Sequence, residues 1–279
     1  MPDPDGPYAY LHSYREGDQH GLFARIPRES AFQTERDQED ILLDIDALAK
    51  TASGFFNIGQ ISHSPDHLHL AFSVDYHGAE NFEIFIKPIN GDIFSTGVKS
   101  SSGSLQWAAD GKTLFWVEKD ENQRPYAVFA KNVLTPEAQV KLIYKENDPG
   151  FFVSVDESDT GQYILINSHN HTTSEIWAIP SHSPDETPKC LSPRQSGHEY
   201  SFHDTETEAS ILSNRDGATN FQIFTAPIST PEFRHWAPLI PHDPAALIIG
   251  IETYQGHLCL LYTSPSPRDQ RGSRMPSSA

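Results

Sequence analysis

The stretch Asn81–Ile89 (NFEIFIKPI) has the composition of a β-strand, because aromatic and β-branched residues run up to a proline that ends the segment. The same pattern returns after 44, 48 and 47 residues, in Pro125–Val133 (PYAVFAKNV), Thr173–Ser181 (TSEIWAIPS) and Asn220–Ile228 (NFQIFTAPI). A fixed period of this length indicates a repeat architecture, in which each repeat is one supersecondary unit.

Two more strand patterns recur before each of these segments. One follows an acidic or glycine turn, and its copies are Ser64–Asp75 (SPDHLHLAFSVD), Ala108–Asp120 (AADGKTLFWVEKD), Glu157–His169 (ESDTGQYILINSH) and Thr205–Gly217 (TETEASILSNRDG). Asp-Gly and Asp-x-Gly turns are typical of hairpins, since Gly and Asp tolerate positive φ. The other is seen in Phe55–Ser62 (FFNIGQIS), Gly103–Ala108 (GSLQWA) and Phe151–Asp156 (FFVSVD).

A fourth, linking strand such as Asp92–Thr96 (DIFST) or Lys141–Lys145 (KLIYK) completes each unit. The sequence therefore predicts an all-β fold, a β-propeller with blades of four antiparallel strands that repeat every 44–50 residues. Four complete repeats lie between Phe55 and Ile228, with partial ones at both ends. Glu39–Thr51 is expected to be a strand followed by one or two helical turns. An all-β sandwich is the structural alternative, but it does not predict so regular a repeat.

The chain of 279 residues has a formal net charge of −18, from 38 acidic and 20 basic side chains. This charge argues against a nucleic-acid or membrane-surface binder, because both require a basic face. No apolar run approaches the roughly 20 residues that span a bilayer, and the N-terminus MPDPDGPYAY has no signal-peptide pattern. Two cysteines, Cys190 and Cys259, cannot form a disulfide framework. We expect a cytoplasmic protein with neither nucleic acid nor membrane as a partner.

Residues 263–279 (TSPSPRDQRGSRMPSSA) differ from the rest of the chain, since three arginines stand there against Asp269. One interpretation is a disordered tail. The other is that the string is non-native, because it closely resembles translated sequencing adapter. We expect the native sequence to end between His257 and Thr263, so that residues 1–262 form a partial propeller.

Compact catalytic motifs are absent: the chain contains no Gly-x-Ser-x-Gly elbow, phosphate loop, GxGxxG, His-Glu-x-x-His or cysteine pair with metal spacing. No catalytic, cofactor-binding or metal-binding residue, and no cofactor, is therefore predicted.

Several short patterns allow two interpretations. His67/His69 and His169/His171 have the spacing of residues on one face of a strand, so each pair could ligate a metal, but solvent-facing positions at hairpin ends are the simpler explanation. Lys145–Gly150 (KENDPG) is either an acidic loop that lines a pore or, as we favour, an ordinary connection between blades. Arg215-Asp216-Gly217 is expected to be a turn.

Five longer runs resemble one known family. They are Gly6–Arg25, Ile41–Ala49, Ser101–Phe129, Asp148–Ser181 and Gly197–Ile228, and the resemblance as a whole extends over roughly residues 6–258. These runs look like the propeller of the oligopeptidase B branch of the prolyl oligopeptidase family of serine peptidases.

The resemblance implies a seven-bladed propeller stacked on an α/β-hydrolase domain that carries a Ser-Asp-His triad. It also implies cleavage of short peptides after Arg or Lys, with the propeller gating access and docking on the catalytic domain. About five of the seven blades would lie in this chain, truncated at both ends, and the catalytic domain would be absent. The chain alone should then be inactive, short peptides would be the parent's substrates, and the oligomeric state stays open.

Two alternatives remain. A non-catalytic β-propeller would present its loops to protein partners. A propeller enzyme with its site at the central channel would need acids, histidines or a metal that converge on the innermost strands.

Overall fold

The structure is a computed structural model that describes residues 6–31, 39–254 and 257–263. Its elements are almost all strands, with a single α-helix in the described ranges. The N-terminal elements are β1 (Tyr8–Ser13), β2 (Leu22–Pro27), a 3₁₀ turn (Arg28–Ser30), β3 (Asp40–Asp44) and α1 (Ile45–Thr51).

Four sheets of four antiparallel strands follow, and in each the strands pair in chain order. The first holds β4 (Asn57–His63), β5 (His69–Asp75), β6 (Glu83–Pro88) and β7 (Phe94–Ser95). The second holds β8 (Leu105–Trp107), β9 (Thr113–Lys119), β10 (Pro125–Asn132) and β11 (Lys141–Lys145). The third holds β12 (Phe152–Glu157), β13 (Tyr163–His169), β14 (Ser174–Pro180) and β15 (Lys189–Cys190). The fourth holds β16 (Tyr200–Asp204), β17 (Glu208–Ser213), a 3₁₀ turn (Arg215–Gly217), β18 (Gln222–Pro227), a 3₁₀ turn (Phe233–His235) and β19 (Ala237–Ile240).

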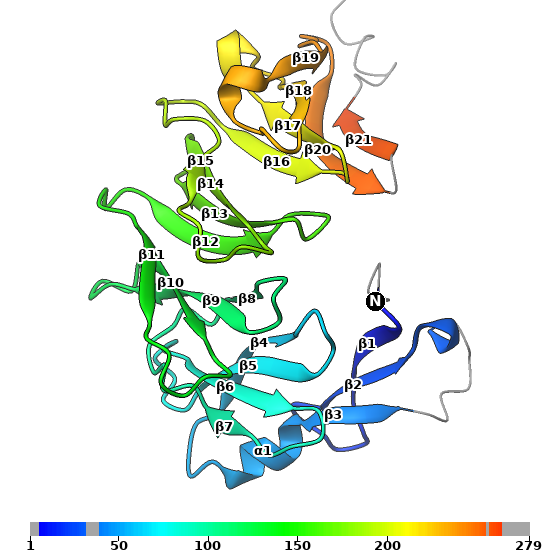
Figure 1. The fold of residues 1–279 in the computed structure, drawn as a ribbon, viewed down its shortest axis with the longest axis vertical. Coiled ribbons are helices and arrows are strands. Elements are labelled where there is room, and N and C mark those ends of the chain that lie inside the picture. The colour runs from blue at the N-terminus through cyan, green and yellow to red at the C-terminus, as the bar shows by residue number, and fades with distance from the viewer. Residues whose placement is uncertain (1–5, 32–38, 255–256, 264–279) are drawn as a thin grey trace, which may run out of the picture.

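A smaller sheet flanks this series on each side. Strands β1, β2 and β3 form a three-stranded sheet, and β20 (Leu247–Tyr254) pairs with β21 (His257–Thr263) in a hairpin. Figure 1 shows the sheets following one another along an open arc, with the first strands of the sheets toward the hollow of the arc and the last strands on its outside. The all-β prediction is confirmed, as are the four complete repeats and the partial units on either side of them.

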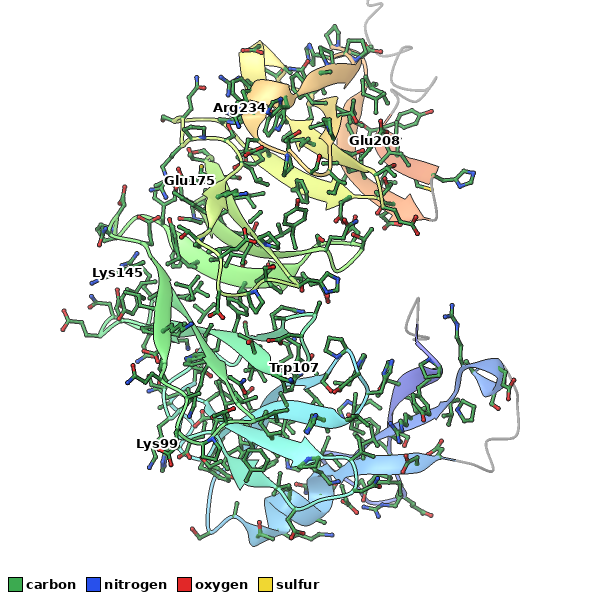
Figure 2. All side chains as sticks on the ribbon, viewed as in Figure 1. Lys99, Trp107, Lys145, Glu175, Glu208 and Arg234 are labelled. Atoms are coloured by element: carbon green, nitrogen blue, oxygen red, sulfur yellow. The ribbon has the colours of Figure 1, made fainter. Side chains whose placement is uncertain are left out.

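Apolar side chains are shared between neighbouring sheets all along the arc. One cluster, for example, joins Phe115 and Val128 of the second four-stranded sheet to Val155 and Ile164 of the third. The second strands lie between two such layers and are covered on both faces, so β5 has six consecutive buried residues from Leu70 to Asp75, which are apolar apart from Ser73 and Asp75. A continuous apolar run is expected for a strand buried on both faces. Figure 2 shows Trp107 on the inner side of the arc and Lys145 on its outer side.

The segment Glu39–Thr51 forms a strand and then a short helix, as predicted. Asp44 caps α1, because its side chain accepts a hydrogen bond from Ala47 N–H at 2.8 Å. The predicted Asp-Gly hairpin turn is also present, and Gly111 adopts φ 65° there. Of the 263–279 segment, Thr263 ends β21, and residues 264–279 lie outside the described residues.

Candidate functional site

The first strands of the sheets form the surface toward the hollow of the arc (Figure 1). These six described strands, β1, β4, β8, β12, β16 and β20, contain no Lys or Arg. Their acidic residues are Asp156, Glu157, Asp204 and Glu252. The inner strands therefore favour cationic over anionic groups.

Two of these acids lie at the end of β12 and are oriented by neutral groups. Asp156 accepts hydrogen bonds from Ser154 Oγ at 3.0 Å and from Asn167 Nδ2 at 2.8 Å. Glu157 accepts one from Gln106 Nε2, in the preceding sheet, at 3.1 Å. Each of these contacts fixes a carboxylate without offsetting its charge.

A pocket of about 260 Å³ lies at the seam between the third and fourth four-stranded sheets. Its wall consists of Ser154, Asn167, Ser168, His169, Ser174, Glu175, Ile176 and Tyr200. The carboxylate of Glu175 accepts hydrogen bonds from Arg194 N–H at 2.9 Å and from Arg194 Nη2 at 3.1 Å. The acid in the pocket is thus paired with a cation.

The segment Lys145–Gly150 connects β11 to β12 and is a connection between blades, as favoured from the sequence. Within it Glu146 is buried, accepts a hydrogen bond from Ser168 Oγ at 2.5 Å and forms an ion pair with Arg194. Burial alone would raise the pKa of Glu146, but the hydrogen bonds from Arg194 and Ser168 outweigh it and lower the pKa to about 2. Glu146 is therefore ionised at neutral pH.

Arg194 joins several segments at this point. Its Nη2 donates to Ser168 Oγ at 3.0 Å, and its guanidinium lies 3.7 Å from the centroid of the Phe151 ring. Together with the Glu146 and Glu175 contacts, these interactions hold the loop between β15 and β16 against the loop between β11 and β12. The cluster stabilises the contact between these two loops, and its charged side chains are paired with one another.

The histidine pairs are not two ligands on one strand. His67 lies in the turn before β5 with φ 58°, whereas β5 begins at His69. His67 Nδ1 is 2.7 Å from Tyr10 Oη in the neighbouring sheet. His169 ends β13, and His171 is exposed in the following turn. The expected alternation fails in both cases because a turn interrupts the strand.

Arg215-Asp216-Gly217 forms the expected turn, a 3₁₀ segment in which Asp216 has φ 58°. Arg215 lies over the ring of Phe233 at 3.7 Å from its centroid. Cys190 and Cys259 are both free thiols.

No group of three or more His, Cys, Asp and Glu side chains within the described ranges is placed to hold a metal ion. Likewise, no helix in that part of the chain is long and apolar enough to cross a membrane.

The Arg194 cluster was not found by sequence reasoning. Glu146 lies in a segment that the sequence marks as an exposed turn, and Arg194 lies 48 residues away. The available signal was an acid and an arginine in two loops at the repeat spacing, which is too common a pattern to single out a pair.

Radially arranged, four-stranded antiparallel sheets with shared apolar seams define a β-propeller domain. The family model for the "Prolyl oligopeptidase, N-terminal beta-propeller domain" matches residues 1–265. The chain belongs to the prolyl oligopeptidase family, within its N-terminal β-propeller domain. The resemblance stated from the sequence is confirmed.

Two peptidases are similar in sequence. Dipeptidyl aminopeptidase BI of Pseudoxanthomonas mexicana is 31% identical over 224 residues, which are 78% of this chain and 30% of that protein. Protease 2 of Moraxella lacunata is 28% identical over 232 residues, which are 82% of this chain and 33% of that protein. The chain thus spans about a third of the length of these relatives.

Two solved structures share the fold. Oligopeptidase B from Leishmania major has a TM-score of 0.80 at 23% identity and covers 93% of this chain with 36% of its own. Oligopeptidase B from Trypanosoma brucei has a TM-score of 0.76 at 24% identity and covers 94% of this chain with 38% of its own.

Proposed function

We propose that this chain is the propeller of a serine peptidase of the oligopeptidase B type, which hydrolyses short peptides after Arg or Lys. The observation that carries the proposal is the match of residues 1–265 to the propeller of a peptidase family. The α/β-hydrolase domain with its catalytic triad lies outside this chain, so the chain's own role is to gate substrate access and to dock on that domain.

The inner strands support the gating role. A narrow passage lined by side chains admits short peptides and excludes folded proteins. The six inner strands contribute acids but neither Lys nor Arg, so a peptide with basic side chains is attracted toward the axis.

The test begins with the gene, read onward from the codon of His257. The proposal expects further blades and then a Gly-x-Ser-x-Gly elbow with Asp and His downstream. The complete product should cleave short reporter peptides after Arg and Lys, and should leave long or folded substrates intact. A stop codon without a hydrolase domain would instead favour a non-catalytic interaction propeller.

The chain of 279 residues provides a second test by itself. We expect no turnover of an Arg-containing reporter peptide, because no triad of the family lies in it. Turnover that copurifies with the chain through successive columns would overturn this assignment.

A further inference from the structure

Strand β16 carries a serine and a histidine on the same face. Ser201 and His203 are two residues apart, and Ser201 Oγ lies 3.2 Å from His203 Nε2. The other ring nitrogen, Nδ1, lies 3.1 Å from Asp159 Oδ2, in the turn between β12 and β13 of the preceding sheet. The three side chains thus form a Ser–His–Asp chain of contacts built from two blades.

The carboxylate sets the tautomer of the ring. Asp159 Oδ2 also accepts a hydrogen bond from Thr253 Oγ1 of β20 at 2.7 Å, so it is held from both sides. Burial raises the pKa of Asp159, but hydrogen bonds from His203 and Thr253 outweigh it, and the pKa lies below its ordinary value. An ionised Asp159 accepts a hydrogen bond from Nδ1–H, which leaves the Nε2 lone pair directed at the Ser201 hydroxyl.

The backbone places a donor beside the serine. The ladder bonds Asn214 N–H to Glu199 O and Thr205 N–H to Glu208 O flank the β16–β17 pairing. Because hydrogen bonding alternates along an antiparallel ladder, the odd-numbered residues of β16 bond to β17, and Phe202 N–H points away from it. An N–H of the residue after the serine is the position from which a hydrolase stabilises an oxyanion.

Solvent reaches this group. Ser201 and His203 are half-buried and alternate with the buried Tyr200 and Phe202. A second serine–histidine contact, between His198 Nε2 and Ser213 Oγ at 2.9 Å, differs in that both residues are buried. His198 Nδ1 has no hydrogen-bond partner there. Of these two contacts, only the one on β16 combines a carboxylate hydrogen-bonded to the ring with access from solvent.

We propose that Ser201, His203 and Asp159 form a nucleophilic serine site within the propeller, which reacts with small, unhindered esters and phosphonyl donors. Ser201 Oγ forms a bond to the acyl carbon or the phosphorus, and its proton passes to His203 Nε2. With an ester, the departing alkoxide takes that proton and leaves as the alcohol, and water then releases the acid. With a fluorophosphonate, the P–F bond breaks, fluoride leaves and the adduct persists. The site is independent of the peptidase proposal, since it uses none of the family's triad.

The test treats the 279-residue chain with a small alkyl fluorophosphonate and maps the adduct by peptide mass spectrometry. We expect one adduct per chain, on Ser201, and none in Ser201→Ala. His203→Gln and Asp159→Asn should label about 100-fold more slowly, in line with the usual contribution of a general base. A wild-type chain without an adduct on Ser201 would overturn the proposal.

The control variant is Ser183→Ala, which removes an exposed hydroxyl in the turn between β14 and β15, away from the site. Labelling of Ser201 should be unchanged in it. Circular dichroism of each variant reports folding. A folded His203→Gln chain that labels within about threefold of wild type also overturns the proposal, because the reaction of Ser201 would then not depend on a general base.

Discussion

Gln60 and Leu105 belong to neighbouring sheets and exchange two hydrogen bonds: Gln60 Nε2 donates to Leu105 O at 2.9 Å, and Leu105 N–H donates to Gln60 Oε1 at 2.9 Å. Leu105 begins β8, which pairs with β9 along one edge only. The amide of Gln60 therefore forms hydrogen bonds with backbone groups on the other edge of β8, as an additional strand would. Blades are joined here by polar contacts at the axis in addition to the apolar seam.

Replacing Gln60 tests this link. Gln60→Ala removes both hydrogen bonds and leaves the edge groups of Leu105 without their protein partner, so we expect a loss of about 1–3 kcal/mol in unfolding free energy. The measurement is the urea midpoint, with the slope of the transition as a check on the mechanism. The matched control is Gln195→Ala at an exposed position, which should change stability by less than about 0.5 kcal/mol. Equal midpoints for the two variants would contradict the role of Gln60.

A glycine next to Gln60 allows the same close approach. A Cβ at Gly59 would collide with Ser73 Oγ and lie 3.0 Å from the Phe82 ring. Because both neighbours are packed, Gly59→Ala should lower the thermal midpoint and cost about 1–3 kcal/mol. Gly54→Ala is the control, since nothing lies within 4 Å of a Cβ there. A Gly59→Ala chain as stable as the Gly54→Ala chain would show that Ser73 and Phe82 can move to accept a Cβ at little cost in free energy.

The sequence predicted the fold because the fold is local. Each blade is built from strands adjacent in the chain, so alternation, turn residues and the repeat all lie within one window of the sequence. The Asp110-Gly111 turn and the buried run Leu70–Val74 are both visible without a structure.

The candidate sites could not be predicted in the same way, because they form between blades. Asp159 and His203 are 44 residues apart, and their contact depends on the angle between two sheets. The metal-site alternative for His67/His69 assumed that both residues lie on one strand, but the positive φ at His67 places it in the turn before β5, in line with the hairpin-end interpretation favoured from the sequence. The periodicity of the sequence predicts which residues share a strand. The packing of neighbouring sheets determines which strands contribute residues to one site.

The buried pair of Glu146 and Arg194 makes a prediction about pH. The pKa of Glu146 is about 2 in the folded chain against an ordinary value of 4.5, so its carboxylate stabilises the fold above pH 4.5 and loses that effect as the pH falls toward 2. Glu146→Gln should be less stable than wild type at pH 7, and the difference should shrink over that interval. The measurement is the urea midpoint of both chains at several pH values.

The control for that series is Asp185→Asn, which removes an exposed ion pair with Lys141. Its effect should stay within about 0.5 kcal/mol at every pH, as is usual for exposed pairs. A Glu146→Gln difference that is constant from pH 7 to pH 2 would show that the carboxylate charge contributes nothing.

The acids at the end of β12 make the last prediction, which rests on the proposed peptidase. In the complete enzyme, Asp156→Asn with Glu157→Gln should raise the KM for an Arg-containing peptide several-fold with little change in kcat, because these side chains act on encounter and touch no reacting atom. The effect should fade as the ionic strength rises from about 0.01 M to 1 M, where the screening length drops from about 30 to 3 Å. Glu137→Gln with Glu186→Gln, on exposed turns between β10 and β11 and between β14 and β15, is the matched loss of two charges away from the axis. If it changes KM as much as the β12 pair does, the attraction comes from the net charge of −18 rather than from the inner strands.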